Sequence, residues 1–490
     1  MLTAFLIFWP LLAAIVLFLL RPQNAKAIAL GASVIELIVS LIVVIQFDKQ
    51  AVDTQFAISV PWIASMGITF SAGIDGISLL LVLLTTVLVP FIILASFGHT
   101  YEKSHTFYGL ILMMQMALVG VFTALDGFLF YLFWEMALIP IYFICLIWGG
   151  ENRGPITFKF FVYTLGGSLL MLVALVFLYL HTTDHSFAIQ SLYQAGRSLS
   201  QAEQGYVFWA FFVAFAIKMP VFPFHTWQPD TYTTSPAQGT MLLSAIMLKM
   251  GIYGLLRWLV PMVPMGVHDW SYTAIILSVI GIVYASCIAI VQKDFKKLIA
   301  YSSIAHVGLI SAGLLTLTKV GVQGAMIQML SHGIIVFALF YLVEIITVRT
   351  RTRELEQLGG IRGVAPILTT VFLVVMLGSV ALPFTSGFVG EFLLINSLVQ
   401  YQFILGAVAA LTTILGAVYM FRAFQKSMLG DAVSIVKSIS DLTSQEKLVL
   451  YPVVVLVVLI GIYPTPLLSI SESAVNNLLV IVSDFSASIK

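Results

Sequence analysis

Two lysines lie deep inside long apolar stretches of this sequence, where an ammonium group is costly. Lys218 and Lys249 both fall within residues 211–258, on either side of a segment rich in proline and hydroxyl side chains. An ammonium group at the centre of a membrane helix costs at least about 2.5–3.5 kcal/mol, and ionisable residues kept at that cost usually carry ions or protons. We therefore interpret both lysines as groups that hold and pass protons.

Glu135 is the expected partner of the first of these lysines. It lies in the middle of another apolar stretch, FYLFWEMALIP. An ion pair between Glu135 and Lys218 reduces the cost of burying both groups, whereas the alternative is a lone buried carboxylic acid that stays neutral. Because the carboxylate stabilises the charged lysine, moving or protonating Glu135 would make Lys218 release its proton. The pair thus has the properties of a proton switch.

The other deeply placed ionisable residues are candidates for a proton relay. Lys249 is too far from the ends of its stretch to reach water, so a relay is favoured over an ammonium group held only by backbone carbonyls. Imidazole titrates near neutrality and can both donate and accept. This favours a relay role for His306, whereas for His332 a relay and a hydrogen-bonded core residue are about equally consistent with the sequence. Glu391 lies eight residues after Pro383 and is expected to end the relay.

Three further ionisable residues are expected to have other roles. Glu36 and Glu344 lie in an early stretch or near the end of one, so we expect them to be structural. His225 lies between the proline-rich break and the following loop, and we expect it to line an access route from the cytoplasm.

The composition indicates what kind of fold must position these groups. Apolar residues make up 60% of the chain and charged residues 9%, whereas soluble domains contain about 25% charged residues. Apolar stretches of about 20 residues, long enough to cross a bilayer as a helix, recur from one end to the other. The first is interpreted as a helix rather than a signal peptide, because no positive charge precedes it and it is too long. The sequence predicts an all-α polytopic membrane protein with about 14 transmembrane helices, at residues 2–20, 27–46, 77–97, 107–125, 127–147, 161–181, 206–222, 237–258, 272–292, 298–317, 321–347, 366–397, 403–425 and 448–468.

Lysine and arginine predict how these helices are oriented. The odd-numbered loops carry sixteen of these residues and the even-numbered loops four, with Arg257 counted among the four. Because basic loops stay on the cytoplasmic side, the odd-numbered loops are expected there. An even number of helices then places both termini on the outer, periplasmic side of a bacterial inner membrane.

Two of the predicted helices are interrupted. Residues 206–222 contain Pro220 and are followed by Pro223, and residues 366–397 contain Pro383. Proline removes a backbone donor and clashes with the preceding turn, so the helix breaks. Unwound backbone persists at membrane depth only where protein or a wet cavity covers it. Prolines are common in membrane helices, but two breaks that each lie beside an ionisable residue favour an ion path.

No loop is long enough for a soluble domain, so residues 1–490 are expected to form a single membrane domain. The longest loops, residues 47–76 and 182–205, are expected to form short hairpins or interfacial helices outside the membrane. Residues 469–490 are expected to form a surface helix or a tail.

The two cysteines and the glycine pattern give no sign of a cofactor. Cys145 and Cys287 lie in separate apolar stretches, without the spacing of a disulfide framework, a zinc site or an iron–sulfur site. No glycine-rich phosphate loop follows a predicted strand, so no nucleotide site is expected. Redox cofactors that the function requires are therefore expected on other chains and none on this one.

Four motifs resemble the antiporter-like membrane subunits of respiratory complex I: FWEMALIPIYFI, AFAIKMPVFPFHTWQPDTYTTSPAQGTMLLSAIMLKMGIYG, KDFKKLIAYSSIAHVG and LPFTSGFVGEFLL. The resemblance extends over about residues 70–430. It implies two inverted five-helix repeats, at about residues 107–258 and 272–425, each holding one broken helix. Three N-terminal helices would then occupy residues 1–106, and a C-terminal helix and tail residues 426–490.

The resemblance also implies a role for each candidate residue. Glu135 and Lys218 would form the pump switch, Lys249 the central relay, His306 and His332 the connectors, and Glu391 the outward terminal residue. One member of this family carries glutamate in its second broken helix where the others carry lysine, and Glu391 favours that member.

The implied function is proton translocation in an NADH:quinone oxidoreductase, driven by redox chemistry on other chains. The implied partners are other membrane subunits on both sides and the lipid bilayer, with no nucleic acid. The alternative is a subunit of a multisubunit Na⁺/H⁺ antiporter without a redox partner, which the lysines and glutamates suit as well. A chain that itself binds quinone or haem is disfavoured, because no cofactor motif appears.

Overall fold

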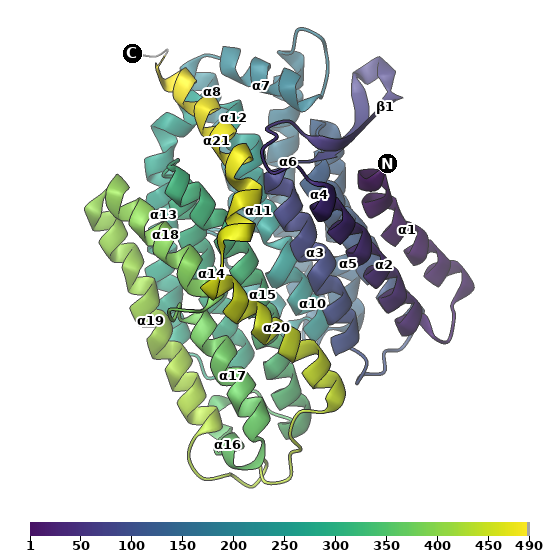
Figure 1. Cartoon of the computed structure of the whole chain (residues 1–490), viewed down its shortest axis with the longest axis vertical. Coiled ribbons are helices and arrows are strands. Elements are labelled where there is room, and N and C mark those ends of the chain that lie inside the picture. Colours follow the sequence, from purple (N-terminus) through teal and green to yellow (C-terminus); the bar gives the residue numbers. More distant parts are fainter. Residues whose placement is uncertain (488–490) are drawn as a thin grey trace.

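Long apolar helices make up nearly all of the protein. The computed structural model describes residues 1–487, with side chains described up to residue 482. Residues 488–490 of the expected tail lie outside this range. In Figure 1, α14 (Phe295–Leu314) and α15 (Lys319–Thr350) run through the middle of the bundle, with α1 and α2 on one side and α19 on the other. α15 is almost entirely buried, as expected of a helix surrounded by others.

Thirteen helices in the described part of the chain are long and apolar enough to cross a membrane. Their number and spacing agree with the predicted polytopic all-α fold, and most predicted boundaries are within a few residues of the observed ones. Besides α14 and α15, they are α1 (Leu2–Leu20), α2 (Ala25–Gln46), α3 (Gly76–Ala95), α4 (Ser104–Thr123), α5 (Gly127–Trp148), α6 (Arg153–Leu180), the run from α10 to α12 (Ala237–Met262), α13 (Pro264–Val291), α19 (Phe403–Met428), α20 (Ser444–Ile462) and α21 (Thr465–Ala487).

By its contacts, α21 is a surface helix and not a span. It packs across α3, α12, α13 and α15. Its contacts are with the ends of helices that lie at one end of the bundle. Glu472 forms an ion pair of 2.6 Å with Lys319 at the start of α15, and the Ser473 hydroxyl donates to the carbonyl of Lys49, just after α2. The surface helix expected after residue 469 is therefore present. The other twelve helices, together with two interrupted ones, correspond to the fourteen predicted spans.

The first interrupted span is α8 (Gln201–Lys218), which ends where the prolines begin. The chain then runs without regular helix to α9 (Gln228–Thr234). The indole of Trp227 donates a 2.9 Å hydrogen bond to the Ile217 carbonyl, which the break has left without its helical partner. A buried side chain thus satisfies the backbone at the break, as the sequence led us to expect.

The second interrupted span consists of α17 (Pro366–Ser379) and α18 (Ser386–Tyr401). Between them, Ala381 and Phe384 have positive φ angles of 55° and 71°, a strained conformation for residues with a side chain. α20 crosses this break closely, because a Cβ on Gly461 would lie 2.3 Å from the backbone of Thr385. The predicted break at Pro383 is therefore real and is covered by a neighbouring helix.

The segment from α10 (Ala237–Leu242) to α12 (Val260–Met262) is one continuous helix with two wide turns. These π-helical turns are η2 (Leu243–Met247) and η3 (Leu255–Leu259), and they flank the short α11 (Lys249–Gly254). A π turn adds a residue to the helical repeat and leaves one carbonyl without its usual partner. Lys249 therefore begins a helical segment that lies between two irregularities.

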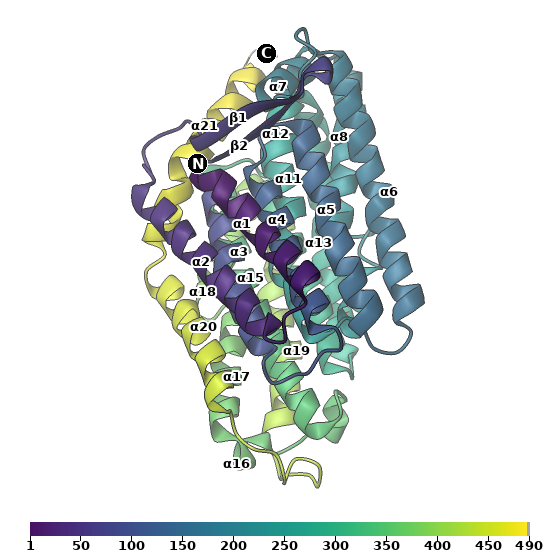
Figure 2. The same cartoon turned by 90° about the vertical axis from the view of Figure 1, so that its right-hand side faces the viewer.

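The two longest loops form small structures at one end of the molecule. Residues 47–76 contain the antiparallel hairpin of β1 (Gln55–Ile63) and β2 (Ile68–Ile74), and residues 182–205 contain α7 (Ile189–Ser198). Figure 2 shows the hairpin, α7 and the C-terminal end of α21 together at this end, with α16 at the other. We call the end with α16 the basic end, because the lysine- and arginine-rich loops lie there. The remaining short helices are η1 (Ala64–Met66), η4 (Leu355–Gln357) and α16 (Ile361–Val364).

Arg257 was counted among the basic residues of a loop, although the predicted helix over residues 237–258 also includes it, and the loop assignment is wrong. The helix continues to Met262, and Arg257 lies within η3, where it forms an ion pair with Asp75 at the start of α3. The side chains of Arg257 and Asp75 are only 16% and 9% exposed. Burial alone would raise the pKa of Asp75, but Arg257 and the hydrogen bonds from Ser78 hold it below its usual value. The carboxylate is therefore charged at neutral pH, and the pair contributes fully there.

We expect Asp75→Asn to destabilise the protein by about 3–5 kcal/mol, because it leaves Arg257 buried without a counter-charge. Asparagine keeps the shape of the side chain and can still cap α3, so the change isolates the charge. The measurement is the Tm of the purified full-length chain in detergent at pH 7. The control is Glu472→Gln, which removes an ion pair whose side chains are about half exposed and should cost less than about 1 kcal/mol. Equal Tm values for the two variants would contradict the prediction.

Candidate functional site

Lys218 is the last residue of α8 and is almost completely buried, at 3% exposure. Its Nζ atom lies 5.3 Å from the centre of the Trp134 ring on α5, in a cation–π arrangement. No hydrogen bond or ion pair joins this Nζ to another residue in the described part of the chain. The ammonium group is therefore stabilised mainly by the Trp134 ring and by the charge of Glu135.

Glu135 follows Trp134 on α5 and is partly buried. Its charge acts on that of Lys218, although no direct ion pair joins the two side chains in the described part of the chain. One of its carboxyl oxygens, Oε1, is buried without a hydrogen-bond partner. The structure thus brings the two predicted switch residues into electrostatic contact, with Trp134 beside the amine.

Lys249 is completely buried and has two polar neighbours. Its Nζ donates to the Ser244 carbonyl at 2.7 Å and lies 2.8 Å from Nδ1 of His332 on α15. The Ser244 carbonyl is available because η2 shifts the helical register: the Leu248 amide bonds the Leu243 carbonyl instead. The π turn therefore builds half of the lysine site.

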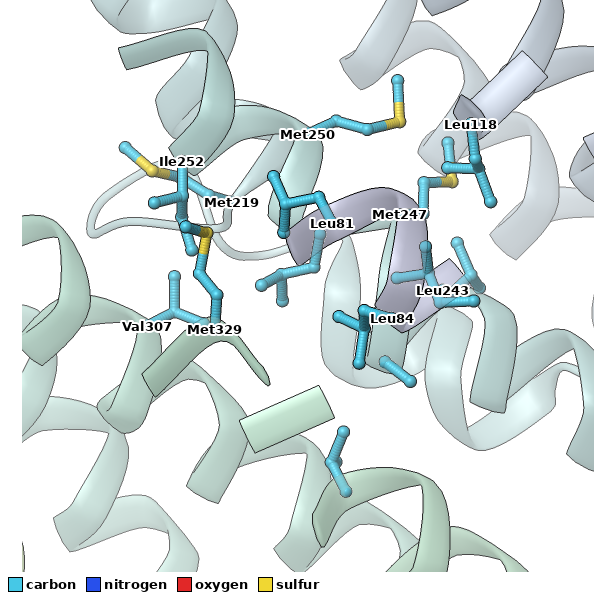
Figure 3. Packing of buried hydrophobic residues seen from close by; sticks show 14 of the residues in the cluster. Leu81, Leu84, Leu118, Met219, Leu243, Met247, Met250, Ile252, Val307 and Met329 are labelled. Atoms are coloured by element: carbon cyan, nitrogen blue, oxygen red, sulfur yellow. The ribbon is translucent and has the colours of Figure 1, made fainter. Parts of the chain in front are cut away.

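The helix that carries this lysine packs against α3 through apolar side chains. Figure 3 shows Leu84 of α3 beside Leu243 of that helix, with Leu81, Met247 and Met250 nearby. Because Lys249 is completely buried, its charge depends on its polar partners, Ser244 and His332.

The second histidine and Glu391 continue the series from His332. The His306 and His332 rings are 5.8 Å apart between centroids, and His306 Nδ1 lies 2.8 Å from Glu391 Oε1 on α18. The latter distance suits an ion pair, although the approach is not aligned as a hydrogen bond. Gln328 also reaches Glu391 Oε1, at a long 3.5 Å, and Ser303 lies 3.1 Å from His332 Nε2.

A small cavity connects these groups. It has a volume of about 20 Å³ and is lined by His306, His332, Gln328, Ser303 and Glu391 among others. Glu391 Oε2 and Gln328 Oε1 face no hydrogen-bond partner in the described chain. A cavity of this size has room for about one water molecule, which needs two to four polar partners, and the polar groups of its lining could supply them.

The buried series has a gap between its two lysines. α8 and α11 cross closely there, and the contact is apolar, with Met219 against Gly251. The structure therefore brings Glu135 and Lys218 together, and Lys249, His332, His306 and Glu391 together, but it joins the two groups only through this crossing.

The other predicted residues lie away from this series. Glu36 on α2 is completely buried, with both carboxyl oxygens unpartnered. His225 is buried below the α8 break between the rings of Phe222 and Tyr284, with Nδ1 unpartnered. Glu344 lies at the basic end of α15, 3.7 Å from His99.

Several contributing residues were missed at the sequence level. Ser303 precedes His306 by three positions and Gln328 precedes His332 by four, so each shares a helix face with its histidine. That spacing of polar residues in apolar helices was a usable signal. No sequence pattern indicated the Ser244 carbonyl, because its availability depends on the π turn.

Among residues 1–482, no three His, Cys, Asp or Glu side chains are grouped so that they could hold a metal ion. That redox cofactors belong to other chains stays a prediction. The groups assembled here are amines, imidazoles and carboxylates, and what they can exchange among themselves is protons.

Comparisons with known proteins bear on the site as a whole. Residues 124–416 match the family model described as NADH:quinone oxidoreductase/Mrp antiporter, TM. NADH-quinone oxidoreductase subunit M of Rhodobacter capsulatus is 41% identical over 475 residues, 94% of this chain and 92% of the relative. Subunit M of Rickettsia prowazekii (strain Madrid E) is 38% identical over 481 residues, 97% of this chain and 98% of the relative. A chain of respiratory complex I from Thermus thermophilus with bound NADH is similar in structure, with a TM-score of 0.89 and 29% identity, covering 98% of this chain and 100% of that one.

We expect Gly251→Ala to disturb the α8–α11 crossing. A Cβ there would lie 2.7 Å from the Phe215 carbonyl oxygen and 2.9 Å from the Met219 amide nitrogen, backbone atoms that cannot turn aside. Overpacking of this kind costs about 1–3 kcal/mol. The control is Gly166→Ala on α6, where a Cβ meets nothing within 4 Å and the Tm should be unchanged or higher. If both variants have the wild-type Tm, the crossing is not as tight as described.

Proposed function

The chain belongs to the NADH:quinone oxidoreductase/Mrp antiporter transmembrane family, and from this we propose that it works as a proton-translocating, antiporter-like subunit of an NADH:quinone oxidoreductase, equivalent to subunit M. The observation that carries the proposal is the buried series of Lys249, His332, His306 and Glu391, in which neighbouring polar atoms lie 2.8 Å apart at both ends. Such a series is costly to bury and has no evident structural purpose.

In the proposed relay, a proton on Lys249 moves to Nδ1 of His332, with which Nζ is already in contact. His332 then gives up a proton from Nε2, and His306 receives it through a water molecule in the small cavity. His306 passes it to Glu391, which lies in the second turn of α18. Each step leaves the donor with one proton fewer and the acceptor with one more.

The proposed switch is the pair of Glu135 and Lys218. Because no hydrogen bond holds Lys218 Nζ, its charge depends on Glu135 and on the ring of Trp134. A small movement of Glu135, or its protonation, would therefore change how firmly Lys218 holds a proton. The unwound segment that follows Lys218 gives α8 freedom for such a movement.

We also propose the arrangement of the chain in the membrane. The basic end faces the cytoplasm, and both termini lie on the opposite, periplasmic side of a bacterial inner membrane. The bias that supports this orientation is the one predicted from the sequence, sixteen basic residues in the odd-numbered loops against four in the even-numbered ones. The two interrupted spans are proposed to be equivalent members of two inverted five-helix repeats, at about residues 107–258 and 272–425.

The proposed partners are the redox-active chains of the oxidoreductase and other membrane subunits beside this one. The subunit is then part of a translocase without carrying the redox chemistry itself. The alternative, a Na⁺/H⁺ antiporter subunit without a redox partner, has less support, because the full-length relatives are named as subunits of NADH-quinone oxidoreductase. Co-purification of the tagged chain with NADH-oxidising chains supports the first function, and co-purification with antiporter chains alone supports the second.

Lys218→Ala should block the coupled reaction. In the purified complex reconstituted in vesicles, we expect NADH oxidation and proton pumping to fall together by at least about tenfold, because the switch has lost its proton carrier. Lys319→Ala, which removes a half-exposed surface charge, is the control and should keep both rates. Unchanged pumping in an intact Lys218→Ala complex would refute the proposed function.

Glu135→Gln tests the other half of the switch. The amide keeps the shape of the side chain but can no longer stabilise Lys218, so pumping should fall by about tenfold or more. The matched control is Glu36→Gln, which alters a carboxyl group that is also buried but lies on α2. If the two variants pump equally, the charge of Glu135 has no special role.

A further inference from the structure

A second cavity, which the proposed relay does not use, opens at the basic end. It has a volume of about 410 Å³ and lies between the C-terminal ends of α3 and α15 and the start of α20. His99 and Glu344 face each other in it, and Arg349 forms a 2.6 Å ion pair with Glu446. The side chains of His99 and Glu344 are 27% and 23% exposed. The cavity is thus large enough for many water molecules and holds a carboxylate at its wall.

Glu344 is also coupled to groups that lie deeper in the protein. Its charge acts on Lys296, a buried lysine of α14 whose Nζ donates to the Ser235 carbonyl at 2.7 Å. It acts on Tyr101 as well, and the Tyr101 hydroxyl donates to Oε1 of Gln238. Polar groups therefore continue inward from the cavity to the start of α10.

From Gln238 the polar groups lead toward Lys249. The Nε2 atom of Gln238 is buried and has no partner in the described chain, so it can bind a water molecule. Thr240 and Ser244 follow on one face of the same helix, and the Ser244 carbonyl holds Lys249 Nζ. Six residues of helix, about 9 Å at the usual rise, separate Gln238 from Ser244.

We propose that this cavity is a separate proton-uptake route, in which Glu344 takes protons from the basic side and supplies them to Lys249. The proposal rests on the proposed function. A proton bound to the Glu344 carboxyl group moves through water positioned by Tyr101 and Gln238 and ends on the Lys249 amine, leaving Glu344 as a carboxylate beside His99. Lys249 is then reloaded from its own side of the apolar crossing at Gly251, without a proton having to pass that crossing from Lys218.

The competing explanation is that His99 and Glu344 only tie α3 to α15. A tie of that kind needs neither a cavity nor contact with deeper groups, and its loss should affect stability more than pumping. Two experiments distinguish the explanations: one asks whether pumping requires a carboxyl group at position 344, and the other asks whether blocking the cavity stops pumping.

The first test changes Glu344 in the reconstituted complex. Glu344→Gln should lower proton pumping by about tenfold, and Glu344→Asp, which keeps a carboxyl group, should restore most of it. The control is Glu356→Gln, which removes a half-exposed carboxylate at the same end and should leave pumping unchanged. Full pumping by Glu344→Gln overturns the proposal. If Glu344→Gln pumps fully while Lys218→Ala in the same preparations does not pump, the uptake route is refuted and the proposed function stands. If Lys218→Ala also pumps normally, the proposed function itself fails.

The second test asks whether the cavity is wet and in use. Gly98 lines it, and a Cβ there meets nothing within 4 Å, so Gly98→Cys should fold normally. In a Cys287→Ser background, with Cys145 buried, a membrane-impermeant maleimide applied to the basic side should label this cysteine and block pumping. Gly363→Cys, in the exposed α16 at the same end and equally open, should be labelled without loss of pumping. A labelled Gly98→Cys complex that pumps at the unlabelled rate, or one that is not labelled at all, contradicts the proposal.

Discussion

The need to satisfy an amine buried among hydrocarbon side chains is the constraint on which the rest of this structure depends. Lys249 has no water-facing surface, so its stability rests on the Ser244 carbonyl and on His332. One of these acceptors exists only because the helix widens into a π turn. The other comes from α15, a helix that is itself almost entirely buried. The π turn and the central position of α15 thus each supply one of the two polar partners that Lys249 requires.

The two interrupted helices also need partners for buried polar groups, in this case the backbone groups that the breaks leave unpaired. At the end of α8 the freed Ile217 carbonyl receives the Trp227 indole, and the break before α18 is covered by α20 at Gly461. Lys218 is the last residue before the first break, whereas Glu391 lies more than one turn inside α18, after the second. Unwound backbone in a membrane protein binds water or polar side chains, so the first break gives Lys218 a polar neighbourhood that a regular helix lacks.

The sequence predicted the helices well because hydropathy and length determine whether a segment crosses a bilayer. It also predicted the breaks, since proline acts locally, and the outer hairpin and surface helix. It did not predict contacts between distant segments: 83 residues separate Lys249 from His332, and only the fold brings them together. Arg257 was misplaced because a charged residue near the end of an apolar stretch usually marks a loop, whereas here a buried carboxylate compensates it. The cavity beside Glu344 could not be predicted for a related reason, since a cavity between three helix ends leaves no mark on any one of them.

The crossing of α8 and α11 at Gly251 has a mechanical consequence. The Gly251 backbone lies against the Phe215 carbonyl and against the amide and Cβ of Met219, which leaves little room for either helix to shift at the contact. A displacement of the end of α8 would then be transmitted to the helix that carries Lys249. The two lysine regions would then be mechanically coupled, because a movement of one helix would displace the other even where no proton passes between them.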